Sequence, residues 1–194
     1  QRDARLESAE HHFRRALRAG PEDIDAIYGL AMVLCDRRNF SEALPLIEQA
    51  VARDDSDARY HFRRGIVLGG LGRDEDSRKA LEASIAIDPL QSLTRNALAN
   101  YLRERGELVG AIEHYALAAK AEPLEPFTYG NAAVSLQELG DIHASVRLGR
   151  MCLALNPFNR VFFSNLLLAL NYAHDLPRSA LALAHQQYGA LVRH

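Results

Sequence analysis

The chain has 194 residues, 48% of them hydrophobic, which is enough apolar side chain to bury a core. It contains 30 Ala and 29 Leu but only 18 β-branched residues, a balance that favours helices and argues against a β-rich fold. With 12 Gly and 7 Pro, it is neither collagenous nor of low complexity. The longest uncharged apolar stretch, residues 161–174, is shorter than the roughly 20 residues that cross a bilayer. The first residues lack the apolar run of a signal peptide and begin without Met, so we expect a piece cut from a longer chain.

The charge balance argues against binding driven by electrostatics alone. The 23 basic and 25 acidic residues give a formal charge of -2, so we expect neither nucleic acid nor a membrane as a partner. The two cysteines, Cys35 and Cys152, are too few for a secreted disulfide scaffold. We therefore predict a reducing, cytoplasmic compartment.

A pattern with a period of 34 residues organises the whole chain. Each unit has a small residue in its predicted first helix and another early in its second helix. A large apolar residue follows four positions later, and a further small residue comes three positions after that. The small residues of the first helices are Ala31, Gly65, Ala99 and Ala133. Those early in the second helices are Ala9, Ala43, Ser77, Ala111, Ser145 and Ser179. The large residues are Phe13, Ile47, Leu81 and Tyr115, with Gly149 as an exception, and the later small ones are Ala16, Ala50, Ser84, Ala118 and Cys152. Small residues at these places would let paired helices approach closely.

Proline and glycine mark the turns of each unit. Proline cannot continue a helix and recurs where a unit ends, at Pro21, Pro89, Pro123 and Pro157. Glycine recurs after the predicted first helix, where a left-handed cap is expected, at Gly72, Gly106 and Gly140. The apolar residues between these marks follow the spacing of amphipathic helices. Each unit is therefore predicted to be a helix, a short turn, a second helix and a proline turn.

This spacing resembles the tetratricopeptide repeat. The resemblance implies an all-α fold, a right-handed superhelix or α-solenoid of about 5.5 helix-turn-helix repeats and roughly 11 helices. It covers residues 1–194 as a single solenoid. The expected divisions are a partial repeat at 1–23, full repeats at 24–57, 58–91, 92–125 and 126–159, and a degenerate capping or junction repeat at 160–194.

The resemblance also implies a concave groove, lined by the first helices, that binds an extended peptide or a partner segment. In the family, groove contacts come from fixed positions of each first helix. Carried over to this sequence, the expected groove residues are Tyr28, Arg59, Phe62, Arg63, Asn96, Asn100, Arg103, Asn131, Gln137 and Asn165.

Two pairs among these residues suggest narrower hypotheses. Arg59 and Arg63 are four positions apart and resemble the basic half of the carboxylate clamp of tetratricopeptide cochaperones, since guanidinium groups suit carboxylates. The alternative is that both are solvated and pair with neighbouring acids. Asn131 and Asn165 share one register and resemble the asparagine ladder of O-linked N-acetylglucosamine transferases, where amides hold a peptide backbone. The alternative is two exposed asparagines in helix interiors.

A second resemblance lies near the end of the chain. Ser164-Asn165-Leu166-Leu167, Leu170-Asn171-Tyr172 and Asp175-Leu176 resemble the junction between repeats and catalytic region in bacterial SPINDLY-like relatives of O-linked N-acetylglucosamine transferase. It implies that the parent protein transfers a sugar from a nucleotide donor to protein side chains, and that this chain selects the acceptor. This acceptor-recognition role is the alternative to a plain peptide-binding module.

No residues in the sequence form a recognisable catalytic or metal site. The eight histidines are dispersed, no His-x3-His or Cys-x2-Cys pair exists, and His61 is better explained as a packed, hydrogen-bonded ring. Cys35 is either a reactive thiol or an inert, partly buried one. We expect no catalytic residue, metal or cofactor in this chain, and a protein or peptide as partner. Weak self-association is a further expectation if the last repeat exposes Phe162, Phe163 and Leu166 to Leu168.

Overall fold

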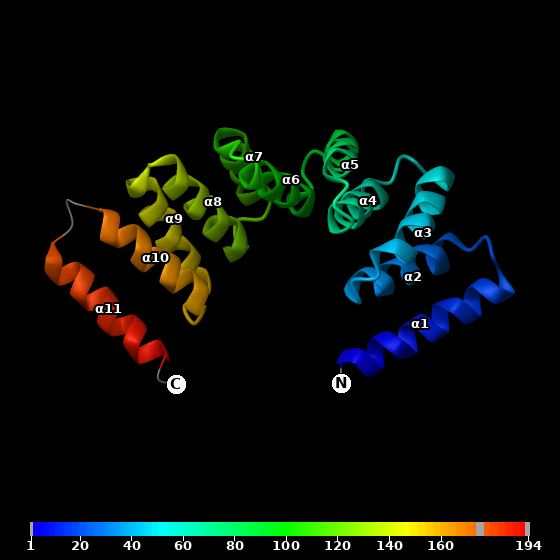
Figure 1. Ribbon diagram of the computed structural model, residues 1–194, viewed down its shortest axis with the longest axis horizontal. Coiled ribbons are helices and arrows are strands. Elements are labelled where there is room, and N and C mark those ends of the chain that lie inside the picture. Colours follow the sequence, from blue (N-terminus) through cyan, green and yellow to red (C-terminus); the bar gives the residue numbers. More distant parts are fainter. Residues whose placement is uncertain (1, 174–176, 193–194) are drawn as a thin grey trace. The chain divides into compact units, whose positions relative to one another are not determined.

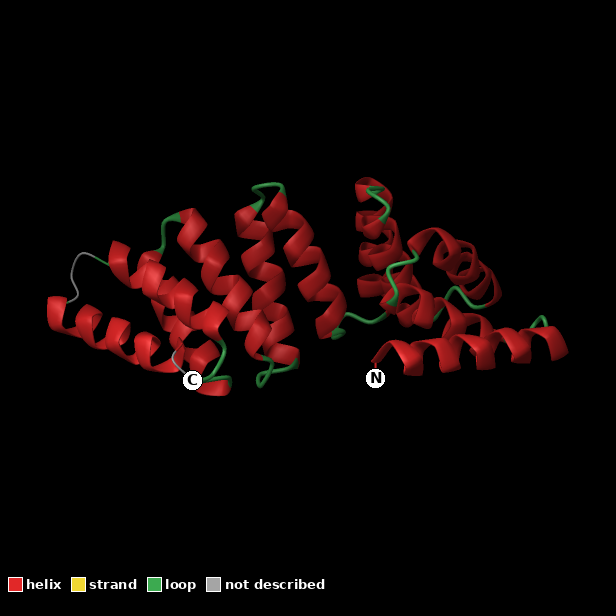
Figure 2. Ribbon diagram, turned by 60° about the horizontal axis from the view of Figure 1, so that its bottom comes forward, coloured by secondary structure: helices red, strands yellow, loops and turns green. Residues whose placement is uncertain are grey.

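The computed structural model describes residues 2–173 and 177–192, and all regular structure in this part of the chain is helical (Figures 1 and 2). The eleven helices confirm the predicted all-α repeat fold and its expected number of helices. They are α1 (Arg2–Ala19), α2 (Ile24–Asp36), α3 (Phe40–Arg53), α4 (Ala58–Gly70), α5 (Asp74–Ile87), α6 (Ser92–Glu104), α7 (Leu108–Ala121), α8 (Pro126–Leu139), α9 (Ile142–Leu155), α10 (Arg160–Tyr172) and α11 (Arg178–Val192). Asp175 and Leu176 of the proposed junction motif lie outside the described residues.

The helices form two compact units, residues 1–89 and residues 90–194. In unit 1, α2 packs against α3 and α4 against α5, and α1 packs against α2. In unit 2, the pairs are α6 with α7 and α8 with α9, and α10 packs against both α9 and α11. Each predicted full repeat therefore contains one helix pair.

The packing positions expected from the 34-residue pattern are buried in the four full repeats, whereas Ala9, Phe13 and Ala16 of α1 are only partly buried and Ser179 of α11 is exposed. In unit 1, Ala31, Ala43 and Ile47 have no appreciable exposed surface, and in unit 2 the same holds for Ala111 and Tyr115. Small side chains let the paired helices approach, and the large side chain fills the space beside them. Burial at these registers explains why Ala and Leu dominate the composition.

The turns inside the helix pairs have the predicted left-handed caps. Gly72, Gly106 and Gly140 have φ angles of 73°, 76° and 93°. Arg38 takes the same register in the preceding repeat and has a φ of 58°, a conformation that costs an L-residue free energy and glycine very little. The same turn geometry is therefore kept even where the sequence lacks glycine.

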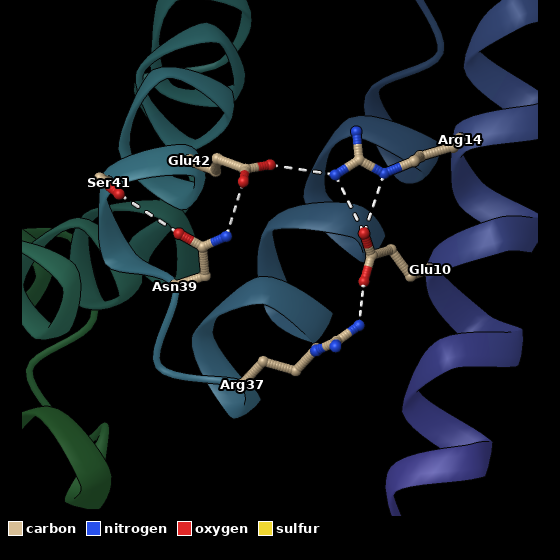
Figure 3. A network of polar contacts seen from close by, with 6 residues as sticks. All are labelled: Glu10, Arg14, Arg37, Asn39, Ser41 and Glu42. Carbon is tan, nitrogen blue, oxygen red and sulfur yellow. Dashed lines mark hydrogen bonds and ion pairs between the residues drawn. The ribbon is translucent and has the colours of Figure 1, made fainter.

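A polar network holds α1 against the first full repeat (Figure 3). Glu10 accepts hydrogen bonds from Arg14 at 3.0 Å and from Arg37 at 2.5 Å. Arg14 also donates to Glu42 at 3.0 Å, and Asn39 donates to the other oxygen of Glu42 at 2.7 Å. The network thus connects α1 with the end of α2 and the start of α3.

The last repeat covers more of its apolar surface than expected. The expectation of exposed apolar side chains is wrong for Phe162, Leu166 and Leu167, which are buried against neighbouring helices, whereas Leu168 is exposed. The Phe163 ring lies 5.6 Å from that of Tyr188 in α11, because α11 packs over this part of α10.

No helix in residues 2–173 and 177–192 combines the length and apolar character that a membrane span needs.

Candidate functional site

Six polar side chains of α6 and α8 form a continuous face in unit 2, which we call the α6/α8 polar face. Asn96, Asn100 and Arg103 lie about one helical turn apart and therefore on one side of α6. The face has three contacts: Asn96 Nδ2 donates to Thr128 Oγ1 at 2.8 Å, Asn131 Nδ2 donates to Asn100 Oδ1 at 3.2 Å, and Arg103 pairs with Glu138 at 3.3 Å. Four of the predicted groove residues are thus brought together.

Tyr115 of α7 supports this face from beneath. Its ring is fully buried in the large packing position, and its hydroxyl donates to Asn100 Oδ1 at 2.5 Å. Burial raises the pKa of the Tyr115 hydroxyl, and a hydrogen bond from Arg103 acts in the opposite direction. Asn100 Oδ1 therefore accepts two hydrogen bonds, which fixes its amide in one orientation.

Two buried polar atoms of the face have no hydrogen-bond partner in the described part of the chain. They are Asn96 Oδ1 and Arg103 Nε, although both side chains make a contact through another atom. Buried polar atoms are normally paired in folded proteins. Both atoms lie below the exposed part of the face, so the groups open to a ligand are the other polar atoms of these side chains.

The other two predicted residues of unit 2, Gln137 and Asn165, lie beside a small cavity between α8, α9 and α10. Its lining also includes Gly149, which stands at the large packing position of its repeat and against which the Leu166 side chain packs. The cavity measures about 10 Å³, which is barely enough for one water molecule. It is a packing void and too small for a peptide side chain.

In unit 1 the predicted residues form an aromatic and basic cluster. The rings of Tyr28 and Tyr60 lie 4.9 Å apart, and the Arg63 guanidinium lies 5.2 Å from the ring of Phe62, which is buried. Burial raises the pKa of Tyr28, while a hydrogen bond from Arg63 lowers it. Arg63 Nε is buried and has no partner among the described residues.

Arg59, by contrast, already has an anionic partner. Its guanidinium donates to both carboxylate oxygens of Asp57, with the shortest contact at 2.6 Å. The hydrogen bond from Arg59 holds the pKa of Asp57 below its usual value. For Arg59, therefore, the structure favours pairing with a neighbouring acid over the carboxylate clamp.

The asparagine pair is arranged differently from a ladder running from Asn131 to Asn165. The Nδ2 group of Asn131 donates to Asn100 on the preceding first helix, whereas Asn165 lines the cavity. Asn131 is thus part of a contact inside the repeats. Whether either asparagine contacts a ligand stays a prediction.

Both cysteines and His61 have environments that favour structural roles. Burial raises the pKa of Cys35, and it raises that of Cys152 to about 12, which favours the inert interpretation of both thiols. His61 Nε2 lies 2.8 Å from the carbonyl oxygen of Asp55, as expected for a hydrogen-bonded ring. Across residues 2–173 and 177–192, no three His, Cys, Asp or Glu side chains cluster as metal ligands would.

Comparison with protein families identifies the repeat. Two family models, each described as a tetratricopeptide repeat, match residues 2–62 and 62–126, which together make up more than half of the chain. The chain belongs to the tetratricopeptide repeat family. Such repeats are typically non-catalytic modules for protein–protein interaction, in agreement with the prediction that this chain is not itself an enzyme. A search of curated proteins found no match.

Solved structures share this tetratricopeptide fold at low sequence identity. PilF of Pseudomonas aeruginosa matches with a TM-score of 0.82 and 19% identity, over 98% of this chain and 86% of that one. A MamA fragment from Desulfovibrio magneticus RS-1 gives 0.78 and 14%, over 88% and 95%. YrrB, described as a tetratricopeptide protein with an unusual peptide-binding site, gives 0.73 and 14%, over 92% and 91%. At these identities the likeness concerns the fold alone.

Several residues of these clusters are not predicted from the sequence. The pattern assigns Tyr115 only to packing, and it does not single out Thr128, Glu138 or Tyr60. Thr128 had a signal, because Thr94 stands 34 residues before it and both are buried polar residues at one register. A tyrosine in a packing position that otherwise holds Phe, Ile or Leu was a second signal, since a buried hydroxyl needs a partner.

Proposed function

We propose that this chain is a protein-interaction module that binds an extended peptide segment on the α6/α8 polar face. The observation that supports the proposal is the row of three polar contacts between the first helices α6 and α8, in which the asparagine side chains and Arg103 are partly exposed and Glu138 is exposed. A peptide backbone offers both N–H donors and C=O acceptors. It could therefore pair with amide and guanidinium groups whatever its side chains are.

The charges of the face suit an uncharged or mixed peptide. Arg103 and Glu138 place one positive and one negative group at the same end of the face, 3.3 Å apart. A strongly acidic ligand would be repelled by Glu138, and a strongly basic one by Arg103. The description of YrrB as a peptide-binding tetratricopeptide protein is consistent with this class of ligand.

The cluster of unit 1 is proposed as a separate contact surface, independent of the α6/α8 polar face. Arg63 is its available cation, because Arg59 is held by Asp57. The half-buried Tyr28 side chain lies beside the Arg63 guanidinium, whereas the Phe62 ring, 5.2 Å from it, is buried. Such a surface would accept an aromatic or acidic side chain of the ligand.

Acceptor recognition for a SPINDLY-like glycosyltransferase is the alternative, and it rests on the sequence resemblance in residues 160–176. Of the motif, Ser164, Asn165 and Asn171 lie on α10. Reading the gene beyond His194 tests it: the alternative expects a nucleotide-sugar-binding catalytic domain there. An unrelated domain would contradict it and leave the peptide-binding proposal intact.

The peptide-binding proposal can be tested with peptides selected from a random 12-residue phage library on the immobilised chain. Affinity for a selected, fluorescently labelled peptide would be measured by anisotropy. We expect Asn131→Ala together with Arg103→Ala to weaken binding at least tenfold, because each removes donors from the face. The matched control is Arg147→Ala, an exposed arginine on the second helix α9, which should change the affinity less than twofold. Equal affinities of both variants, with circular dichroism showing both folded, would contradict the proposal.

A further inference from the structure

Unit 2 carries exposed apolar side chains along the turns at which its first helices begin. Two rows repeat with the 34-residue period. The first row is Leu90, Leu124 and Phe158, and the second is Leu93, Phe127 and Val161. Each of the six is between 55% and 79% exposed. We call them the apolar ridge.

The ridge is specific to unit 2 and is not a general consequence of the repeat. In unit 1 the same registers hold Glu22 and Ser56 in the first row, and Asp25 and Arg59 in the second, all of them exposed. The fold therefore tolerates polar residues at these places. The repeat fold therefore does not require apolar residues at all six places in unit 2.

The side chains of the ridge stand on well-fixed backbone. The Glu125 carboxylate caps α8 by accepting from Phe127 N at 3.0 Å, and Asn159 caps α10 by accepting from Val161 N at 3.0 Å. The Tyr129 hydroxyl donates to Pro123 O at 3.0 Å, and the Phe127 ring packs edge-on against Phe162 at 5.0 Å. The surface is therefore already formed before a partner binds, so little conformational entropy of the ridge would be lost on binding.

The size of the ridge fits a protein interface. Six half-exposed large apolar side chains offer roughly 100 Å² each, or about 600 Å² together. This lies at the upper end of the ~300–600 Å² typical of the largest apolar patch on a monomer, and approaches the ~800 Å² that one partner contributes to a standard interface.

The spacing of the ridge fits a helix better than an extended chain. The first helices α6, α8 and α10 contact one another in turn but only lightly, so each row should repeat at about 10 Å, the upper end of the usual distance between packed helices. Seven residues of an α-helix rise about 10.5 Å, which is close to the spacing of the rows. Residues on the same face of a β-strand recur at about 6.7 Å, so successive residues of a strand would not line up with the rows. Two parallel rows match the two apolar positions of a heptad.

The charges beside the ridge indicate the polar character of the partner. Glu122 and Glu125 flank Leu124 at the middle of the ridge and, with Pro123, line a shallow recess, while the exposed Arg160 lies at one end of the ridge. A lysine or arginine next to the apolar stripe of the partner would meet these carboxylates. We propose that the apolar ridge docks an amphipathic helix of a protein partner that carries apolar residues at heptad spacing and basic residues on its flank.

The probe for this proposal is a labelled 21-residue helical peptide with Leu at both apolar heptad positions and Lys on the flanks. We expect Leu124→Ser with Phe158→Ser to weaken its binding to the full chain at least tenfold in fluorescence anisotropy. The matched control is Leu139→Ser with Met151→Ser, two side chains of unit 2 that are 48% and 47% exposed but lie off the ridge. The control should change the affinity less than twofold. The same peptide with Glu on its flanks should bind more weakly than the Lys peptide at low salt.

Three outcomes would overturn the proposal. The first is that the ridge variant binds the Lys peptide as tightly as the original chain, or that the ridge and control variants lose affinity equally. The second is concentration-dependent dimerisation in sedimentation that Leu124→Ser with Phe158→Ser abolishes, because the ridge would then bind a second copy of this chain. The third is co-sedimentation with phosphatidylglycerol vesicles that the same substitutions abolish, because the ridge would then bind lipid.

Discussion

Tyr115 combines packing and polar contact in one side chain. Its ring fills the large position between α6, α7 and α8, and its hydroxyl donates to Asn100 on the α6/α8 polar face. The hydroxyl is buried, so its hydrogen bond is not exchanged for one to water. The packing of unit 2 and the orientation of its proposed binding face thus depend on the same residue.

We expect Tyr115→Phe to lower the free energy of unfolding by about 1–2 kcal/mol, since it keeps the ring but removes the hydrogen bond to Asn100 and the one from Arg103. Urea denaturation followed by circular dichroism would measure this. Tyr172→Phe is the matched control, because the Tyr172 side chain is 54% exposed, and should change stability by less than about 0.5 kcal/mol. Equal stabilities of the two variants would show that the contact with Asn100 contributes nothing.

Gly106 and Arg38 occupy the same register of the repeat and both have a left-handed backbone. Substitutions at these two positions measure how much free energy this conformation costs. A Cβ at Gly106 would meet no atom within 4 Å, so Gly106→Ala introduces only backbone strain and should destabilise the chain by about 1 kcal/mol. Arg38→Gly relieves the same strain and should shift stability the other way by up to about 1 kcal/mol. Thermal or urea unfolding would compare them. A stabilising Gly106→Ala would contradict this account of the turn.

At the scale of elements, the contact of α1 with the first full repeat depends on ionised carboxylates. Hydrogen bonds from Arg14 and Arg37 lower the pKa of Glu10, and those from Asn39 and Arg14 lower that of Glu42. A carboxylate with a lowered pKa in the folded state contributes stability above its unfolded pKa of about 4.3. That contribution is lost as the pH falls through the folded-state value.

Glu10→Gln should therefore destabilise the chain at pH 7, and the difference from the original chain should shrink towards pH 3. The effect should be below about 1 kcal/mol, because these ion pairs lie near the surface. Unfolding in urea across this pH range measures it, and Arg14→Gln should give the same trend. A difference that stays constant with pH would mean that Glu10 acts through packing and not through its charge.

The sequence pattern predicts the helices and their contacts within repeats better than the contacts between first helices. Period and caps determine where α6 and α8 lie, and the small residues determine how closely the paired helices pack. The pairing of Asn131 with Asn100 depends on how α8 is rotated relative to α6. The spacing of residues within one helix does not predict this rotation. The burial of Leu166 and Leu167 likewise depends on how α11 covers α10, which the degenerate last repeat did not reveal.

For the molecule as a whole, the repeats give two compact units with different surfaces. Unit 1 carries the aromatic and basic cluster around Arg63, and unit 2 carries both the α6/α8 polar face and the apolar ridge. In repeat proteins each repeat contacts mainly its neighbours, so surface residues can differ between repeats while the packing positions stay fixed. The two proposed binding surfaces of unit 2 can therefore be changed independently.

The most direct test of the central claim is nuclear magnetic resonance of the ¹⁵N-labelled chain titrated with a phage-selected peptide. If the peptide binds on the α6/α8 polar face, the side-chain amide signals of Asn96, Asn100 and Asn131 should shift most, together with backbone signals of α6 and α8. Shifts confined to the second helices α7 and α9, with those three amides unchanged, would contradict the account.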